Sequence, residues 1–387
     1  EKYFRFALYF TIYSDSAKDL DKESAVLESA LSSKLIVTKR ALLQTENGLN
    51  STLPLNLDEL GIANNLNTSP LSTTFPFVSS DLTGNDGILY GINRHNNSLI
   101  LFDRFQMENA NSVVFAKSGS GKSYAVKLEV LRSLMVGTDV IIIDPENEYK
   151  HLADAVGGTY LDISLNSDFR INPFDLPRPS EDEDNQDILR NSVINLLGLM
   201  KLVLGEIDPT EEALLDKAIW QAYAKKDITA TSDFNNIDPP VMDDLIEVLN
   251  EMVGAESLAQ RLTKYSEGTF AGLLNQPTNV SLNNQLLIFS IRDLEDELRP
   301  IAMFIILGHI WNLVRSELKR RVLVLDEAWI LMQHEDSARF VFGIAKRCRK
   351  YYLGLTTITQ DVADFMASPY GKPIVTNSSI QLLLKQS

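Results

Sequence analysis

Residues 113–123 read Val-Val-Phe-Ala-Lys-Ser-Gly-Ser-Gly-Lys-Ser, an apolar run followed by a turn rich in glycine and serine. The apolar run predicts a buried strand, and the pattern of residues 123–135 predicts a helix directly after the turn. Gly119 and Gly121 would let the backbone curl so that successive N–H groups face one point at the positive end of that helix. This arrangement of strand, turn and helix predicts a phosphate-binding loop in an α/β fold.

Two side chains at the end of this turn complete the pattern for a nucleoside triphosphate. Lys122 would reach the β- and γ-phosphates, and Ser123 would offer its hydroxyl to Mg²⁺. The pattern asks for glycine at its first position, where this chain has Ala116, and a methyl group is small enough that we expect binding to be retained. The alternative is a surface turn that happens to be rich in glycine and serine. The predicted nucleotide-binding residues are Lys117, Ser118, Gly119, Ser120, Gly121, Lys122, Ser123 and Tyr124.

A second motif, Arg-Val-Leu-Val-Leu-Asp-Glu at 321–327, offers the carboxylates that hydrolysis of a nucleotide requires. The apolar run ends in Asp326 and Glu327, so both acids should lie at the carboxyl end of a strand, where ligands bind in open α/β sheets. Asp326 is predicted to hold Mg²⁺, and Glu327 to polarise the attacking water. The alternative is a helix N-terminus whose acids suit the helix dipole. Asp326 lies 204 positions after Lys122, which leaves room for an inserted segment.

A competing acidic cluster, Asp-Pro-Glu-Asn-Glu-Tyr at 144–149, follows the predicted strand at 140–143. In some phosphate-loop proteins the water-activating carboxylate lies at this place. Glu148 and Glu146 are therefore second choices for the general base. The alternative is a solvated turn between a strand and a helix.

Residues 355–360 predict another strand with a polar end. In the common strand order this strand would lie beside the strand of the phosphate loop. Gln360 would then sense the γ-phosphate or help to place water. A glutamine at a surface strand end is the alternative.

Basic residues are concentrated at 346–350, Lys-Arg-Cys-Arg-Lys, in a chain whose net charge is −16. An arginine presented across a subunit boundary can neutralise transition-state charge, so Arg347 and Arg349 are candidates for an arginine finger. The cluster could equally be a solvated helix face that pairs with acids, or a contact with a DNA backbone. The weaker candidates for the finger are Arg292, Arg299 and Arg315.

The order of patterns predicts two domains. Residues 1–105 predict a partial α+β domain, and residues 106–387 predict an α/β domain interrupted by an all-helical insertion at about 181–275. Within the first domain we expect a strand from alternating apolar residues at 4–12, a helix at 19–31, a short strand at 35–37, irregular structure at 47–83 and a hairpin at 88–102. Residues 180–184 are acidic and predict a linker.

Composition limits the class of protein. The 387 residues include a single cysteine, Cys348, which excludes an internal disulfide and fits a reducing compartment such as the cytoplasm. The apolar runs are far shorter than the roughly 20 residues that cross a bilayer. No secretory signal is visible, and the chain reads as a fragment that begins within a strand. The negative net charge argues against indiscriminate binding of nucleic acid, so any DNA contact should be local.

Several motifs together resemble the large type IV secretion and conjugal-transfer ATPases of the VirB/TraC kind, within the broader group of hexameric HerA- and FtsK-like motors. They are SGSGKS at 118–123, DPENEY at 144–149, INPF at 171–174, LDEAW at 325–329, and RK at 349–350 leading to TQ at 359–360. Their order and spacing, from about residue 110 to the C-terminus, carry the resemblance. The departures are Ala116 in the loop and an end at Ser387, where the family usually continues with helical sequence.

The resemblance implies a RecA-like core, a mostly parallel sheet flanked by helices, with an all-helical insertion. It implies ATP and Mg²⁺ as ligands, and hydrolysis that energises assembly of a channel or pilus or the transfer of substrate. Partners would be other secretion-system subunits, including inner-membrane channel proteins that hold the protein at the cytoplasmic side of the membrane. A homo-oligomer is implied, hexameric when active and a monomer or dimer in isolation. The working residues would be Lys122, Asp326, Glu327, Gln360 and an arginine near Arg349.

Two other classes of function use similar motifs. A DNA-translocating coupling protein or helicase-like pump would have basic loops that line a pore, and the acidic composition counts against it. A non-catalytic scaffold that only binds nucleotide needs no water-polarising acid, and the Asp326-Glu327 pair counts against that.

Overall fold

The computed structural model describes residues 2–74, 83–179, 184–234, 236–268, 270–280 and 283–385. Contacts within the chain divide it into two compact units, 1–80 and 81–387. Most of the predicted linker at 180–184 lies outside the described residues. Asp184 is described, and its side chain caps the next helix by accepting from the backbone N–H of Gln186.

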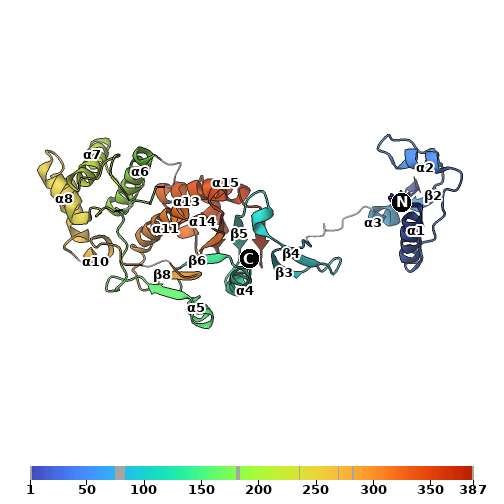
Figure 1. Ribbon diagram of the computed structural model, residues 1–387, viewed down its shortest axis with the longest axis horizontal. Coiled ribbons are helices and arrows are strands. Elements are labelled where there is room, and N and C mark those ends of the chain that lie inside the picture. Colours follow the sequence, from blue (N-terminus) through green and yellow to red (C-terminus); the bar gives the residue numbers. More distant parts are fainter. Residues whose placement is uncertain are drawn as a thin grey trace. The chain divides into compact units, whose positions relative to one another are not determined.

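The larger unit is built on a seven-stranded sheet in the order β11-β5-β10-β9-β6-β8-β7, and every neighbouring pair in it is parallel. Figure 1 labels β5, β6 and β8 of this sheet. The strands are β5 (Ser112–Phe115), β6 (Asp139–Asp144), β7 (Thr159–Asp162), β8 (Leu286–Ser290), β9 (Arg321–Leu325), β10 (Leu353–Thr359) and β11 (Ile380–Leu383). The predicted α/β core is confirmed. The edge strands β7 and β11 were not predicted, because they are short and mix polar with apolar residues.

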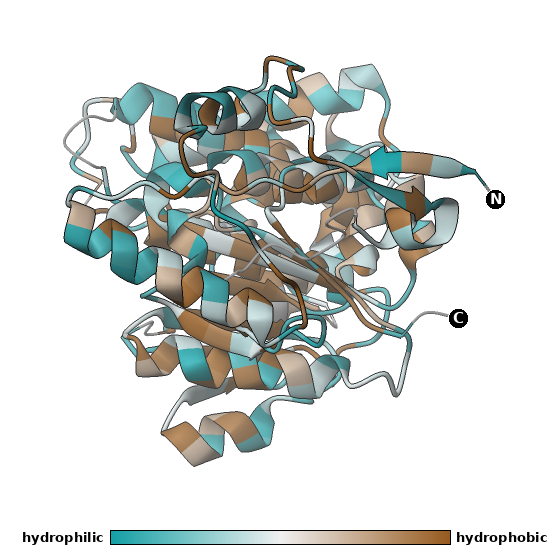
Figure 2. Cartoon of the chain, turned by 90° about the vertical axis from the view of Figure 1, so that its right-hand side faces the viewer, coloured by the Kyte–Doolittle hydropathy of each residue, from teal (hydrophilic) through white to brown (hydrophobic). Residues whose placement is uncertain are grey.

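Helices cover both faces of the sheet, and the sheet separates two hydrophobic cores. β6 contributes side chains to both cores. Ile141 and Ile143 belong to one core, and Val140 and Ile142 to the other, because successive side chains of a strand point to opposite faces. The first core contains residues of α11 (Arg299–Ser316) and α13 (Glu335–Arg347), and the second contains residues of α4 (Lys122–Met135) and α5 (Lys150–Val156). In Figure 2 the strands at the centre of the picture are mostly brown, and teal residues are common on the helices around them. Burial on both faces explains the nearly continuous apolar runs of the central strands.

Short helices complete the carboxyl-terminal half. They are α12 (Trp329–Met332), the 3-10 helix η3 (Cys348–Tyr351), α14 (Val362–Ala367) and α15 (Gly371–Thr376). Of these, α12 follows β9 and α14 follows β10, so the polar residues between strand and helix lie at the carboxyl ends of these strands.

Between β7 and β8 the described residues form helices and no strand. These are α6 (Asn185–Leu204), α7 (Pro209–Lys225), α8 (Met242–Glu251), α9 (Glu256–Leu262), the 3-10 helix η2 (Thr263–Tyr265) and α10 (Ala271–Leu274), and several of them gather at one end of the larger unit in Figure 1. The start of α7 shows why a helix begins there. Asp208 accepts from the backbone of Thr210 and Glu211, and the Glu211 side chain accepts from the backbone of Asp208. The predicted range for the helical insertion, 181–275, spans these helices.

The hairpin of β3 (Ile88–Ile92) and β4 (Leu99–Phe102) is present as predicted, but it belongs to the larger unit. Tyr90 donates to Glu129 of α4 at 2.9 Å, and the buried Arg104, in the 3-10 helix η1 (Arg104–Gln106), pairs with the same carboxylate at 3.0 Å. Arg104 also donates to the backbone carbonyl of Ala110 and to the hydroxyl of Thr356 in β10. These bonds attach residues 88–104 to the larger unit. They explain why the contacts within the chain place the division near residue 80, although the sequence pattern predicted a domain boundary at residue 105.

The smaller unit pairs β1 (Tyr3–Phe6) with β2 (Asn64–Asn67) in antiparallel fashion and includes α1 (Ala17–Ser32), which matches the predicted helix. The predicted strand at 4–12 ends at residue 6. The predicted strand at 35–37 is wrong, because Leu35 has φ of +63° and the N–H groups of Leu35 and Ile36 bond back to α1. The stretch at 47–83, predicted to be irregular, contains most of α2 (Thr45–Thr52), β2 and α3 (Thr68–Thr74).

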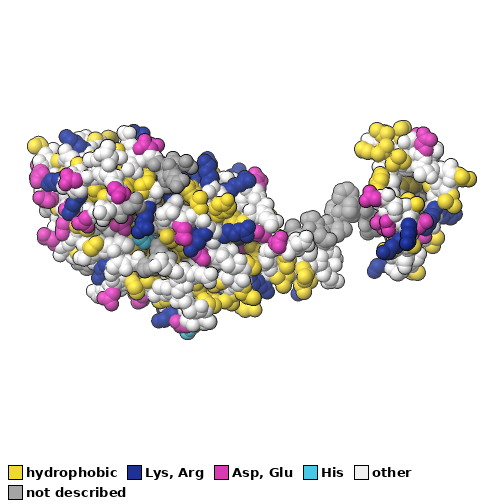
Figure 3. Space-filling view, viewed as in Figure 1, with side chains coloured by type: hydrophobic (Ala, Val, Ile, Leu, Met, Phe, Trp, Pro, Cys, Tyr) yellow, Lys and Arg dark blue, Asp and Glu magenta, His cyan; other side chains and the backbone are white. Residues whose placement is uncertain are grey.

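The surface of the larger unit mixes charges of both signs. On the face shown in Figure 3, acidic and basic side chains are interspersed with polar and apolar groups. In the described part of the chain, no helix combines the length and the apolarity that a membrane crossing requires.

Candidate active site

The predicted phosphate loop connects β5 to α4. Gly119 has φ of +73° and Gly121 has φ of +89°, in the left-handed region that favours glycine. Apart from chain neighbours, a Cβ atom added to either glycine would meet no atom within 4 Å, so the space over the loop is open to a ligand. The Ser120 hydroxyl is buried and has no hydrogen-bond partner among the described residues. An unpaired hydroxyl at a helix N-terminus fits a phosphate oxygen.

The remaining loop residues differ in exposure. Lys117, Ser118 and Tyr124 are exposed, and their contact with a nucleotide stays a prediction. Lys122 is buried, because its side chain turns toward the carboxyl end of β9.

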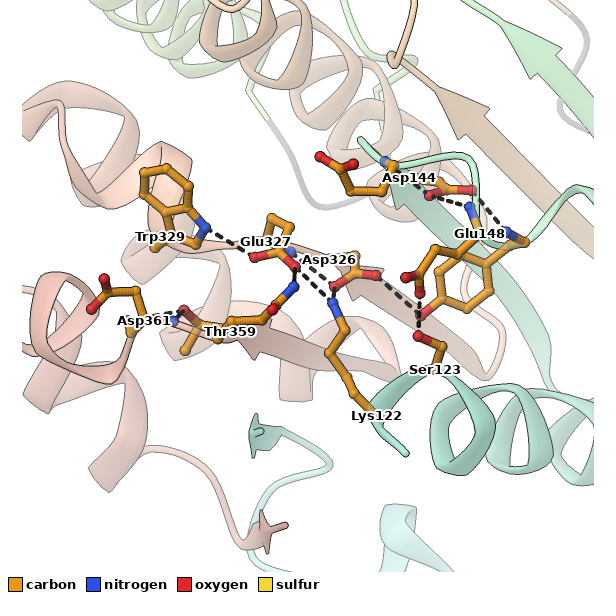
Figure 4. A network of polar contacts seen from close by, with 12 residues as sticks. Lys122, Ser123, Asp144, Glu148, Asp326, Glu327, Trp329, Thr359 and Asp361 are labelled. Carbon is orange, nitrogen blue, oxygen red and sulfur yellow. Dashed lines mark hydrogen bonds and ion pairs between the residues drawn. The ribbon is translucent and has the colours of Figure 1, made fainter. Parts of the chain in front are cut away.

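Lys122 and the two predicted acids converge, although they are remote in the sequence (Figure 4). The Lys122 Nζ atom lies 2.8 Å from Asp326 Oδ1 and 2.7 Å from Glu327 Oε1. β9 lies between β10 and β6 in the sheet, so both acids extend from the carboxyl end of a central strand. Burial disfavours the ammonium, but the two carboxylates outweigh it and raise the pKa of Lys122.

Asp326 is the most enclosed of these groups, with none of its surface exposed. Its Oδ1 atom also accepts from the backbone N–H of Glu327 at 3.0 Å, and its Oδ2 atom lies 3.4 Å from the hydroxyl of Tyr149. Burial raises the pKa of the Asp326 carboxyl to about 6, and the neighbouring Lys122 only partly offsets that effect. The carboxylate that is predicted to hold magnesium therefore has both oxygens already oriented.

Glu327 is held by donors on three sides. Its Oε1 atom accepts from Lys122 and from the amide of Gln360, and its Oε2 atom accepts from the indole N–H of Trp329 at 2.9 Å. The backbone at Glu327 has φ of +49°, which is uncommon for a residue other than glycine. As predicted, β10 pairs with β5, so Gln360 at the end of β10 lies near the phosphate loop.

The loop between β6 and α5 forms the other side of the site. Asp144 has none of its surface exposed and accepts from the backbone N–H groups of Glu146, Glu148 and Tyr149. Burial raises the pKa of the Asp144 carboxyl despite these bonds. Glu148 accepts a hydrogen bond from the hydroxyl of Ser123 (Figure 4). Of the two second choices for the base, the structure therefore brings Glu148 to the loop. Glu146 is half exposed and lies 3.7 Å from Arg299.

The candidate arginines are divided between the amino ends and the carboxyl ends of the strands. Arg347 lies over the ring of Trp311 and donates to the carbonyl of Gly343, and Arg349 is exposed in η3. Both residues precede β10, and Gln360 follows it. They therefore lie at the amino end of this strand, away from Lys122 of the same chain. The weaker candidates Arg292 and Arg299 follow β8 at the carboxyl edge, where Arg299 donates to the carbonyl of Arg292, and Arg315 lies in the last turn of α11.

Two residues of the site, Tyr149 and Trp329, had no role in the prediction. Both stand in the motifs that carry the family resemblance, as the last letters of DPENEY and LDEAW. An aromatic residue beside an acid is more often part of a core, so its position alone did not reveal the hydrogen bond that each one donates.

Comparison with known proteins agrees with this geometry. The family model of the TraG P-loop domain matches residues 99–387. The structure of VirB4 of Thermoanaerobacter pseudethanolicus is 31% identical, covers 80% of this chain and 86% of its own, and superposes with a TM-score of 0.72. The predicted RecA-like arrangement, a parallel sheet flanked by helices, is confirmed by this likeness.

Two curated proteins are more distant relatives. Protein TraC of Escherichia coli (strain K12) is 24% identical over 357 residues, which are 86% of this chain and 39% of TraC. DNA import protein CedB of Sulfolobus acidocaldarius is 23% identical over 291 residues, which are 72% of this chain and 45% of CedB. The chain thus spans less than half the length of the curated relatives it matches.

Proposed function

We propose that this chain, which belongs to the VirB4- and TraC-like family of TraG P-loop domains, is an ATP-hydrolysing motor subunit of a type IV secretion or conjugation system. Hydrolysis would energise assembly of the channel or pilus and transfer of the substrate. The observation that carries the proposal is the meeting of Lys122 with Asp326 and Glu327 beside an open phosphate loop. A site that only bound nucleotide would not require the second acid.

Each group at the site has a chemical task in this reaction. The backbone N–H groups of the loop, the Ser120 hydroxyl and Lys122 bind the phosphates. Ser123 and Asp326 would hold Mg²⁺, which would supply positive charge that neutralises the phosphates. Glu327 accepts the proton of the attacking water, and Gln360 orients the Glu327 carboxylate through the bond described above.

Lys122 must exchange partners when the triphosphate enters. Without nucleotide its charge is balanced by Asp326 and Glu327. When the phosphates take the ammonium, Glu327 is left with Gln360 and Trp329 as donors. The base is therefore freed from its cation only when substrate is present, which suits a carboxylate that has to accept a proton.

The proposal includes assembly. The active form is a hexamer of this chain that works with other secretion-system subunits. Channel proteins hold it at the cytoplasmic side of the inner membrane. Arg347 or Arg349 acts across the subunit boundary, because both lie at the amino end of β10, away from the site of their own chain. Likeness to VirB4 and TraC supports other subunits of a secretion or conjugation system as partners.

The deciding experiment measures ATP turnover against protein concentration, with and without DNA. We expect specific activity to rise with concentration, because oligomers complete the site, and we expect Glu327→Gln to bind ATP without hydrolysing it. A Glu327→Gln protein with unchanged turnover would assign the base to Glu148 instead. Wild-type protein that bound no ATP would refute the proposal. Stimulation of turnover by DNA would favour a DNA pump over a motor that acts on protein partners.

A further inference from the structure

We propose that the loop between β6 and α5, residues 144–149, positions both side chains that hold magnesium. Glu148 orients the Ser123 hydroxyl, and Tyr149 orients the Asp326 carboxylate. This inference rests on the proposed nucleotide site, but it concerns binding of the metal with nucleotide and not hydrolysis. Glu148 and Tyr149 are positioning residues in this scheme.

Glu148 controls the direction of the Ser123 hydroxyl. A hydroxyl has one proton and two lone pairs, so it can give a lone pair to a metal only if its proton points elsewhere. The Glu148 carboxylate accepts the hydrogen bond that this proton makes, and a hydrogen bond to an ionised acceptor is stronger than one between neutral groups. The hydroxyl oxygen is thereby left to the metal, while the Glu148 carboxylate need not bind the metal itself.

Tyr149 performs the matching task for Asp326. Its side chain is fully buried, and its hydroxyl lies 3.4 Å from Asp326 Oδ2, the oxygen that Lys122 does not contact. A phenol O–H is a hydrogen-bond donor, so Tyr149 can orient Asp326 Oδ2 by donating to it. Partners outside the ligand set fix the orientation of metal ligands and tune their affinity in other metal sites.

The loop is itself held in place. Asp144, at the end of β6, accepts from the backbone of Glu148 at 3.1 Å and of Tyr149 at 2.9 Å. Asn147 takes a left-handed φ of +56° and accepts from the hydroxyl of Tyr160 in β7 at 2.7 Å. Two adjacent side chains of this loop therefore reach two different elements, α4 and the end of β9. Figure 4 shows the first of these contacts, between Glu148 and Ser123. A fixed loop that supports both ligands reduces the reorganisation needed when the metal arrives.

The test measures binding of a fluorescent ATP analogue to the full chain while Mg²⁺ is titrated, and again in EDTA. For Glu148→Gln we expect the half-saturating Mg²⁺ concentration to rise about tenfold, with affinity in EDTA changed less than about twofold, and we expect Tyr149→Phe to act in the same direction. The matched control is Asp154→Asn, which removes one negative charge from an exposed position of α5. It should leave the Mg²⁺ midpoint unchanged.

A double-mutant cycle separates positioning from a general loss of charge. If Glu148 acts through the hydroxyl, adding Glu148→Gln to a Ser123→Ala protein should change the Mg²⁺ midpoint less than about twofold. An unchanged midpoint in Glu148→Gln, or a full effect in the Ser123→Ala background, would overturn the inference. Glu148→Asp, which shortens the side chain by one methylene, replaces Glu148→Gln if that variant does not fold, with the same expectation. Because no turnover is measured, a chain that binds Mg-nucleotide through this loop without hydrolysing it would refute the proposed function and leave this inference standing.

Discussion

Replacing Glu327 by glutamine should destabilise the nucleotide-free protein through one identifiable contact. The carboxylate accepts from Lys122 and Gln360 through Oε1 and from Trp329 through Oε2. A glutamine side chain has one oxygen and one NH₂ group. If the oxygen stays with Lys122 and Gln360, the NH₂ group must face the indole N–H of Trp329, and two donors then point at each other.

The magnitude follows from the lost bond and the group left unpaired. A hydrogen bond to a charged group contributes about 1.5–3 kcal/mol, and an unsatisfied buried donor costs about 1–3 kcal/mol. Trp329 is only partly buried, which reduces the second cost. We therefore expect Glu327→Gln to lower the free energy of unfolding by about 2 kcal/mol. Trp329→Phe costs the wild type a hydrogen bond to a charged group and some packing, so it should lower the free energy of unfolding by about 2 kcal/mol. In the Glu327→Gln protein it also removes the opposing donor, which offsets the lost packing, so the change there should be smaller or close to zero.

The assay is urea unfolding of the wild type, both single variants and the double variant, followed by circular dichroism without nucleotide. The transition of the larger unit supplies the midpoint, and its slope should be the same in all four proteins. The loss of packing from indole to phenyl occurs in both backgrounds and cancels in the cycle. Equal destabilisation by Trp329→Phe in both backgrounds would refute the contact and the reasoning built on it.

Three further outcomes are expected. Below its pKa of about 6, the Asp326 carboxyl carries a proton in the free protein but not in the metal-bound form. Affinity for Mg-nucleotide should therefore rise as pH increases toward about 6 and level off above it. Affinity that is flat from about pH 5 to 7 would contradict this expectation. Lys122→Ala should abolish nucleotide binding or turnover, and mixing it with Arg349→Ala protein should restore some ATPase activity, whereas absence of rescue at every ratio would count against an arginine that acts in trans. Asn172→Ala leaves the carbonyl of Pro240 and the N–H of Phe174 without their partner, so the free energy of unfolding should fall by about 2–4 kcal/mol in urea titration, and a fall below about 0.5 kcal/mol would show that these bonds matter little.

The central features of the site could be predicted because each depends on a short stretch of sequence. A strand, a glycine-rich turn and a helix lie within about two dozen residues around Lys122, and the apolar run of β9 ends directly in Asp326 and Glu327. The rule that ligands bind at the carboxyl ends of parallel strands then brings them together across 204 positions. Gln360 followed from the same rule, once its strand was placed beside the phosphate loop.

The contacts that could not be predicted depend on backbone angles that the sequence pattern does not reveal. Glu148 reaches Ser123 because the preceding Asn147 is left-handed, and the bond from Trp329 depends on the turn at Glu327. The error at 35–37 has a similar cause, since an apolar triplet there ends a helix through a left-handed Leu35 and does not pair with a strand. Hydrophobic periodicity reports burial and repeat, and it carries no information on single residues with positive φ.

The left-handed backbone at Glu327 also determines which amino acids position 327 tolerates. Its φ of +49° is readily adopted by glycine and asparagine, whereas a β-branched side chain such as valine or isoleucine is strained there by about 1–3 kcal/mol. In a saturation library, protein abundance should therefore rank glycine and asparagine above valine and isoleucine. Catalytic competence would follow a separate ranking, in which glutamate stands alone. On the proposed function, hydrolysis therefore requires at this position a residue that the local chain geometry does not favour.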